Sequence, residues 1–219
     1  MTPQRTSTNP TADARARVTT APVVTAALRL ADTQRLLADY TTADAAEAAF
    51  QAQMVRLAGV TGDPFSRAWI APGHFTASAF VLSPDESQLL LIRHRKLQRW
   101  LQPGGHFEAD DPSVDAATRR EVAEETGITA LQPLDTGLFD VDVHLIPAHG
   151  GDLAHAHFDL RMAYRAERWT LAETDEVDDV QWVPLQRVQA LETDASVLRA
   201  VARLILRSHN SPPDSALAR

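Results

Sequence analysis

The sequence contains no cysteine. Disulfide bonds, thiolate metal sites and cysteine nucleophiles are therefore excluded, and the composition is compatible with a reducing cytoplasm. No stretch approaches the ~20 apolar residues that a membrane-spanning helix requires, and the N-terminus lacks the cationic segment and apolar run of a secretory signal. We therefore expect a cytoplasmic protein that does not enter a membrane.

Positive charge is also scarce. The chain has 21 Lys and Arg residues against 29 Asp and Glu residues, which gives a formal net charge of -8. Such a surface repels phosphate backbones and argues against general nucleic-acid binding. An anionic small-molecule substrate would then need a cation between itself and the protein. The 219 residues, 44% of them hydrophobic, are enough for one domain with a sizeable core.

Composition divides the chain into a central domain and three flanking segments. Both ends are expected to be disordered, although the acid-poor residues 1–20 also have the composition of a transit peptide. Two helices are expected next, at 22–40 and 43–60, with Thr41 or Thr42 as the N-cap of the second. The expected units are a disordered tail (1–21), a helical extension (22–60), the main domain (61–208) and a second disordered tail (209–219).

Strands and helices are mixed through the main domain. Alternating apolar residues predict strands at 75–82, 89–93, 136–146, 155–166 and near 180–184. Helices are predicted at 112–126, 185–192 and 195–207. The first of these helices has Asp111 as a plausible N-cap and Gly127 just after its end. This mixture predicts an α/β fold in which helices sandwich a mixed sheet.

The most informative segment is the helix that carries Glu121, Glu124 and Glu125. At ~100° per residue, these side chains fall within an arc of roughly 100° on one helix face. Their mutual repulsion is unfavourable, and acids at the last turn of a helix also oppose its dipole. A hard divalent cation such as Mg²⁺ would remove both penalties, because it prefers carboxylate, water and phosphate oxygens. The competing interpretation is a solvated, Glu-rich helix face.

The surrounding residues resemble the Nudix box, Gly-x5-Glu-x7-Arg-Glu-U-x-Glu-Glu-x-Gly-U, where U is a bulky aliphatic residue. The matching positions are Gly105, Arg120, Glu121, Val122, Glu124, Glu125, Gly127 and Ile128. The chain departs from the pattern in two ways: Asp111 replaces the first Glu, and eight residues rather than seven separate it from Arg120. In the family that Glu is mainly structural and pairs near the Arg, a role that a shorter Asp could still fill.

The resemblance implies a Nudix-type α/β/α sandwich over residues 61–208, and it implies a chemistry. Members of the family hydrolyse a nucleoside diphosphate linked to another group X, using Mg²⁺ or Mn²⁺. By resemblance, the metal ligands and catalytic carboxylates would be Glu121, Glu124 and Glu125, with the carbonyl of Gly104 as a further ligand. Many Nudix enzymes carry another carboxylate some six residues before a Trp, a position that Glu176 fits. A solvated acidic loop is the competing interpretation of Glu176.

Two later strands present polar side chains on one face. Strand alternation places Asp140, Asp142 and His144 together, and it places His155, His157, Asp159 and Arg161 together. We predict that these faces form the floor or wall of a substrate cleft, with Asp140, Asp142, His144, His157 and Asp159 as binding residues. A solvent-facing strand surface and a separate zinc site built from the histidines are the alternatives.

Basic residues next to the box are further candidates. Arg93, His94 and Arg95 form a cationic run that could hold phosphate or carboxylate groups, unless it is an ordinary solvated strand end. His106 directly follows the glycine pair and is also predicted to bind substrate. The expected partner is a small nucleotide or another diphosphate, and the extension at 22–60 either covers the core or forms a homodimer interface.

Two rival functions remain at this point. Isoprenyl diphosphate isomerases share the fold, but they need a catalytic cysteine, which this chain lacks. A Nudix-like module that binds a nucleotide without hydrolysing it is the second rival. Such modules usually lose box glutamates, whereas Glu121, Glu124 and Glu125 are all present here. The sequence does not identify the substrate.

Overall fold

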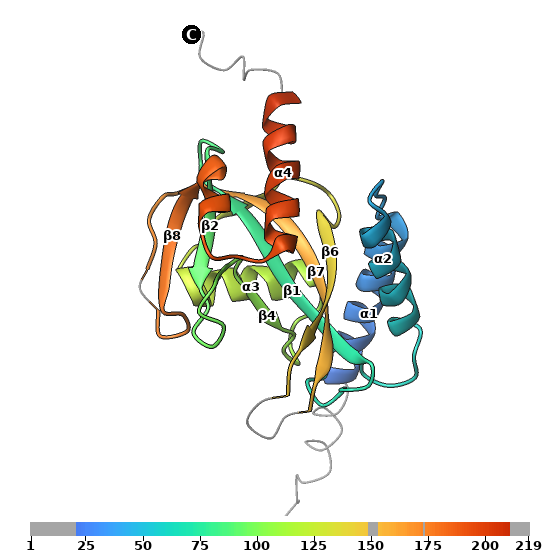
Figure 1. Cartoon of the computed structure of the whole chain (residues 1–219). Helices are drawn as coiled ribbons and strands as arrows, with labels where there is room; N and C mark the ends of the chain where they lie inside the picture. The colour runs from blue at the N-terminus through green and yellow to red at the C-terminus, as the bar shows by residue number, and fades with distance from the viewer. Residues whose placement is uncertain (1–20, 149–152, 173, 211–219) are drawn as a thin grey trace, which may run out of the picture.

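A mixed β-sheet built around one long parallel strand pair organises the molecule (Figure 1). The computed structural model describes residues 21–148, 153–172 and 174–210. The main path of the sheet runs β3 (Trp100–Leu101), β2 (Gln88–Arg93), β1 (Gly73–Leu82), β7 (His155–Ala166) and β5 (Leu131–Pro133). β4 (Gly104–His106) also pairs with β1, β6 (Asp140–Ile146) with β7, and β8 (Asp179–Pro184) with β2. Only β1 and β7 pair in parallel among these neighbours.

Two apolar clusters cover the two faces of this sheet. Alternate residues of β1 divide between them, since Phe75, Ala77, Ala79 and Val81 join one cluster and Phe80 and Leu82 join the other. The first cluster contains residues of α1 (Ala21–Asp39), α2 (Ala45–Leu57) and α3 (Val114–Thr126). The second contains residues of a 3-10 helix, η1 (Leu185–Ala190), and of α4 (Ala195–Asn210). The predicted sandwich of helices around a mixed sheet is therefore confirmed.

The face of β1 that α4 covers changes character along the strand. Phe80 and Leu82 pack in the apolar cluster beneath α4, whereas His74, Thr76 and Ser78 lie earlier on the same face. β7 behaves in the same way, with His157 and Asp159 first and Ala163 later. The polar half of this sheet face is where the candidate site lies.

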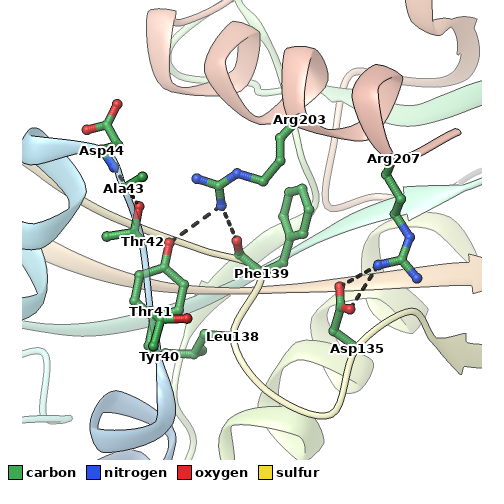
Figure 2. A pocket seen from close by; sticks show the side chains of 10 residues that line it. All are labelled: Tyr40, Thr41, Thr42, Ala43, Asp44, Asp135, Leu138, Phe139, Arg203 and Arg207. Atoms are coloured by element: carbon green, nitrogen blue, oxygen red, sulfur yellow. Dashed lines mark hydrogen bonds and ion pairs between the residues drawn. The ribbon is translucent and has the colours of Figure 1, made fainter. Parts of the chain in front are cut away.

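The N-terminal helices are tied to the sheet by a buried carboxylate. Glu47 of α2 is fully buried and is paired with Arg199 (3.1 Å) and Arg203, both from α4. Tyr40 donates a hydrogen bond to the same carboxylate. Figure 2 shows Arg203 reaching across to Tyr40 and to the carbonyl of Phe139, which precedes β6. Tyr40, Phe139 and Arg203 line a pocket of about 420 Å³, so the contacts that attach the N-terminal helices also form its wall.

Several local predictions need correction. The N-cap of α2 is Asp44, whose carboxylate accepts hydrogen bonds from the amides of Ala46 and Glu47, and not Thr41 or Thr42. The N-cap of α3 is Ser113 rather than Asp111, because Asp111 is turned toward Arg120. The 185–192 helix is of the 3-10 type and ends at Ala190.

The strand predictions also differ in detail. β6 begins at Asp140 rather than at residue 136, and β4 and β5 lie where no strand was expected. Helix α1 begins at Ala21 and α4 extends to Asn210, so the helices take in residues assigned to the tails. The rest of both predicted tails lies outside the described residues. No helix in the described part of the chain is long and apolar enough to cross a membrane.

Candidate functional site

A cavity of about 820 Å³ opens over the polar half of the sheet face. Its floor comes from β1 and β7, and its sides come from β4, β6, the β2–β3 turn and the start of α4. Of the predicted substrate residues, six line it: His94, His106, Asp142, His144, His157 and Asp159. Of the predicted metal ligands, Gly104 and Glu121 line it as well, whereas Glu124 and Glu125 are not among its lining residues.

Strand register explains why these polar residues meet. In the parallel β1–β7 pair, His74 lies beside His157 and Thr76 lies beside Asp159. In the antiparallel β6–β7 pair, His144 lies opposite His157 and Asp142 lies opposite Asp159. Two rows of polar side chains therefore cross three strands on one face. The alternation seen in the sequence predicted the two faces of β6 and β7 correctly, but it did not reveal their common partner, β1.

The box glutamates lie on α3 around Arg120. The guanidinium of Arg120 contacts Glu121 at 3.0 Å, Glu124 at 2.8 Å and Asp111 at 2.9 Å, and it donates a further bond to the carbonyl of His106. Asp111 therefore pairs with the arginine in spite of its shorter side chain and the extra residue between them. The expectation that Asp111 could fill this structural role is confirmed.

Two glycines let the loop approach the glutamates closely. A Cβ on Gly105 would lie 2.6 Å from Oε1 of Glu121, and a Cβ on Gly104 would lie 2.3 Å from the Cβ of Ser78. The amide of Gly104 also donates a hydrogen bond to Glu125, at 2.9 Å. Side chains at these positions would separate β4 from both α3 and β1. The glycine pair thus positions Glu121 and Glu125 against the backbone of β4.

The surroundings of Glu121 and Glu125 raise the pKa of both carboxyl groups. Burial raises the pKa of Glu125 to about 8, against a hydrogen bond from Gly104 that lowers it. The charges of Glu121 and Glu176 raise the pKa of Glu125 further, so Glu176 of the 174–178 loop lies close enough to interact with it. Burial also raises the pKa of Glu121, while Arg120 opposes that rise. Glu124 is exposed on the outer side of the group.

A bound cation fits this arrangement. The donor atoms are hard carboxylate oxygens, which Mg²⁺ and Mn²⁺ accept as ligands. Desolvation and mutual repulsion both penalise the ionised glutamates, and a nearby divalent charge opposes both effects. Glu121, Glu124 and Glu125, with Gly104 beside Glu125, are therefore the residues that would hold such an ion. In the described part of the chain, their oxygens do not converge within 4.8 Å of one another as the ligand atoms of a preformed metal site would.

Part of the predicted cleft wall is instead a buried ionic network. Arg161 is 2% exposed and contacts Asp140 at 3.2 Å, Asp142 at 3.4 Å and Asp159 at 2.7 Å. Asp140 is fully buried, also binds Arg199, and is not among the residues that line the cavity. The placement of Asp140 in the cleft is therefore wrong, because α4 closes over this end of β6. Asp159 reaches the cavity while accepting hydrogen bonds from Thr76 and Ser78.

The basic run beside the box also separates into two parts. His94 lines the cavity, but Arg95 pairs with Asp178 at 3.1 Å on the protein surface. Arg93 lies over the ring of Trp100 and bonds to Gln98. Neither arginine is among the residues lining the cavity, since their side chains pack against the β2–β3 turn and the loop before β8. The structure therefore does not place Arg93 and Arg95 with the other predicted substrate residues.

Some lining residues went unrecognised in the sequence. Thr76 and Ser78 could have been found, because they alternate with apolar Phe75, Ala77 and Ala79 and so mark a polar stretch on an otherwise apolar strand. Arg67, Arg99 and Gln102 also line the cavity. They lie in loops or at strand ends, where no periodic pattern marks them.

Residues 72–204 match the family model described as NUDIX domain. This match covers more than half of the 219 residues. The chain belongs to this family. The resemblance seen in residues 105–128 is therefore confirmed, and the match extends through the whole sheet of the Nudix domain.

Individual relatives are more distant. Over 66 residues, the chain is 35% identical to a Bacillus subtilis (strain 168) protein described provisionally as an 8-oxo-dGTP diphosphatase. The matched segment is 30% of this chain and 44% of that protein, so the chain spans less than half the length of this curated relative.

Solved structures with a similar fold include two hydrolases. A NUDIX-family hydrolase from Clostridium perfringens is 21% identical, with a TM-score of 0.48 over 61% of this chain and 97% of that chain. An Ap4A hydrolase from C. elegans is 15% identical, with a TM-score of 0.49 over 63% of this chain and 98% of that chain.

Proposed function

We propose that the protein is a divalent-metal-dependent pyrophosphohydrolase that cleaves the diphosphate of a nucleoside diphosphate linked to another group. Membership of the Nudix family and the box glutamates support this proposal. The observation that carries it is the position of Glu121 and Glu125 against Gly104 and Gly105, at the edge of a cavity large enough for a nucleotide-sized ligand.

The protein's own groups have distinct roles in this proposal. Glu121, Glu124 and Glu125, with the carbonyl of Gly104, hold Mg²⁺ or Mn²⁺. A bound cation of this kind neutralises charge on the diphosphate and lowers the pKa of the attacking water. Arg120 fixes the orientation of Glu121 and Glu124 and is itself anchored by Asp111. Positioning and electrostatic stabilisation then supply most of the catalysis.

Proton transfer needs a carboxylate near the attacking water. Glu176 is exposed, and its charge interacts with that of Glu125. We assign the general base to Glu176 or to one of the box glutamates. His94, His106, His144 and His157 line the rest of the cavity and are proposed to contact the substrate. The cytoplasmic location, the homodimer and the division of the chain into a 22–60 extension and a 61–208 domain stay predictions.

A phosphate-release screen tests the proposal. Purified protein is incubated with 8-oxo-dGTP, nucleoside triphosphates, ADP-ribose, dinucleoside polyphosphates, nucleotide sugars and coenzyme A, each with Mg²⁺, Mn²⁺ or EDTA. We expect metal-dependent cleavage of one substrate class, with attack at phosphorus shown by ¹⁸O from labelled water appearing in a phosphate product. The screen identifies the substrate class and tests the metal requirement together.

Matched variants connect that activity to the site. Glu124→Gln and Glu125→Gln remove negative charge at constant size, and we expect each to lower kcat by at least about 100-fold. Glu167→Gln makes the same chemical change at an exposed position bonded to Gln132, and it should leave kcat unchanged. Unaltered turnover in both box variants would rule out the assigned mechanism. Nucleotide binding without any turnover would favour a regulatory module.

A further inference from the structure

A cluster of histidines lies at the edge of the cavity, beside the carboxylate site. Five of the eight histidines in the chain have rings stacked or packed on one another: His74, His106, His144, His155 and His157. Three of them form a compact triangle. The ring centroids are 5.0 Å apart for His74 and His106, 4.9 Å for His74 and His157, and 5.0 Å for His106 and His157.

The ligand atoms of these three residues converge. One ring nitrogen from each of His74, His106 and His157 lies within 4.8 Å of the other two. Tetrahedral Zn²⁺ with bonds of about 2.0–2.1 Å needs ligand nitrogens about 3.4 Å apart, so small side-chain rotations bring the three onto one ion. Because the residues lie on β1, β4 and β7, the sheet itself holds the triangle together.

His74 is already oriented as a metal ligand. It is 1% exposed, and its Nδ1 lies 3.2 Å from the carbonyl oxygen of Trp69. A carbonyl can only accept, so Nδ1 carries the proton and Nε2 keeps its lone pair. Nε2 is buried and has no hydrogen-bond partner among the described residues. A ligating histidine with its other ring nitrogen bonded to a backbone carbonyl is a common arrangement at protein metal sites.

His157 lies at the centre of the cluster, where its ring packs against those of His74, His106, His144 and His155. Its Nε2 is also buried without a hydrogen-bond partner in the described structure. Burial lowers the pKa of His157 to about 2 and that of His106 to about 3, and it lowers the pKa of His74 as well. Neutral imidazoles are the form that binds metal. Two unsatisfied nitrogens that point into one cluster are unusual for buried polar atoms, which normally have partners.

From this geometry we propose that His74, His106 and His157 bind a transition-metal cation of the zinc class, at a second site distinct from the carboxylate site on α3. Imidazole nitrogens favour Zn²⁺, whereas Mg²⁺ prefers oxygen ligands, so the two sites select different metals. His106 and His157 line the cavity. The fourth coordination position therefore faces the cavity, where water or an anionic group of a ligand occupies it. The site does not depend on hydrolysis at α3.

Zinc titration of the full-length protein tests this site. The protein is stripped with a chelator and titrated with Zn²⁺ in excess Mg²⁺, with binding followed by competition against a chromophoric chelator. We expect one tightly held Zn²⁺ per chain. His157→Asn and His106→Ala should each weaken binding by more than about 100-fold, because even partners outside the coordination shell are worth about 10–100-fold.

Two control variants distinguish this site from its neighbours. His155→Ala removes a ring that stacks on His74 but lies outside the converging group, and it should retain Zn²⁺. Glu124→Gln with Glu125→Gln impairs the carboxylate site and should also retain Zn²⁺. Loss of zinc in the glutamate variant, with retention in His157→Asn, would place the ion at α3 and overturn the proposal.

A spectroscopic readout on the unaltered chain covers the case in which a histidine variant fails to fold. Co²⁺ bound by three imidazoles and one further ligand gives the intense visible bands of a four-coordinate ion. We expect these bands in the wild-type protein and in His155→Ala, and their displacement by added Zn²⁺. Only the weak bands of six-coordinate Co²⁺, at any ratio of metal to protein, would contradict the proposed site.

Discussion

At the scale of single residues, Glu125 combines two demands that conflict. The proposed function requires its carboxylate to bind a cation, but burial raises its pKa to about 8. Ionisation of such a group opposes folding unless a positive charge is supplied. An ionised Glu125 therefore destabilises the fold locally, at a position that the proposed function requires.

This conflict predicts a pH dependence of stability in the presence of EDTA. A glutamate whose pKa is raised on folding contributes stability below its unfolded pKa of about 4.3, and the contribution is lost as pH rises through about 8. Thermal unfolding between pH 5 and 9 should show a decline of at most about 1.4 kcal/mol per pH unit from this group. Glu125→Gln should flatten the decline, because an amide does not titrate in this range. Its side-chain oxygen can still accept the hydrogen bond from Gly104, so the local structure should be kept.

Addition of Mg²⁺ provides the converse measurement. At pH 9 the cation should raise the Tm of the wild-type protein and have little effect on Glu125→Gln. The exposed control Glu167→Gln should follow the wild type throughout. An identical pH slope in wild type and Glu125→Gln would show that Glu125 does not titrate in this range.

At the scale of elements, the sequence predicted what depends on local pattern. The alternation in 155–166 and the box glutamates on α3 could be assigned because spacing within one element determines them. β4 could not be predicted from the sequence, because Gly104 and Gly105 have no side chains that could show an alternating pattern. They form a strand only because they pair with Ala77 and Ser78 of β1. The same limit applies to Asp140. Alternation predicted the sheet face on which it lies, but it could not predict that α4 covers this part of the face.

The C-terminus of α3 offers a sharp test of local geometry. Gly127 has φ +75°, and a Cβ there would lie 2.5 Å from the Cβ of Ala172. Gly127→Ala should cost about 1–2 kcal/mol from the left-handed backbone alone, and the contact adds to this. That corresponds to a fall in Tm of roughly 2–8 °C for a domain of this size. Because Glu124 and Glu125 lie in the same turn, kcat should fall as well.

Gly137→Ala is the matched control for that substitution. A Cβ at Gly137 would have no heavy atom within 4 Å, and its φ is not among the positive values. This variant should keep the Tm and kcat of the wild type. Equal losses of Tm and kcat in the two variants would contradict this explanation, because only Gly127 has the left-handed backbone conformation.

At the scale of the whole molecule, buried charges connect the N-terminal helices to the sheet. Glu47 from α2 meets Arg199 and Arg203 from α4, and Arg199 continues to Asp140 of β6 at 2.9 Å. Arg161 extends the chain of contacts to Asp159 beneath the cavity. Removing one member of such a network leaves others buried without a partner, which is costly. The extension is therefore expected to unfold together with the Nudix domain.

Glu47 makes this expectation measurable. Burial alone would raise its pKa, but hydrogen bonds from Arg203, Tyr40 and Thr42 outweigh burial and lower the pKa to about 2. Its contribution is therefore present above the unfolded pKa of about 4.3 and is lost as pH falls toward 2. Glu47→Gln should lose about 3–5 kcal/mol at pH 7, much of that from the arginines left unpaired.

Denaturant titrations at pH 7, 4 and 2.5 distinguish a cooperative molecule from two independent units. The gap in stability between wild type and Glu47→Gln should be largest at pH 7 and narrow toward pH 2.5, since acid protonates Glu47 in the wild type. Far-UV circular dichroism reports on all helices. Tryptophan fluorescence reports on the sheet domain and its loops, which contain all four tryptophans, at residues 69, 100, 169 and 182. The two signals should change together in both proteins. In Glu47→Gln, the helical signal could instead be lost at a lower denaturant concentration than the fluorescence signal. If the two signals still coincide in the wild type, that result would show that the Glu47 carboxylate couples unfolding of the extension to unfolding of the sheet.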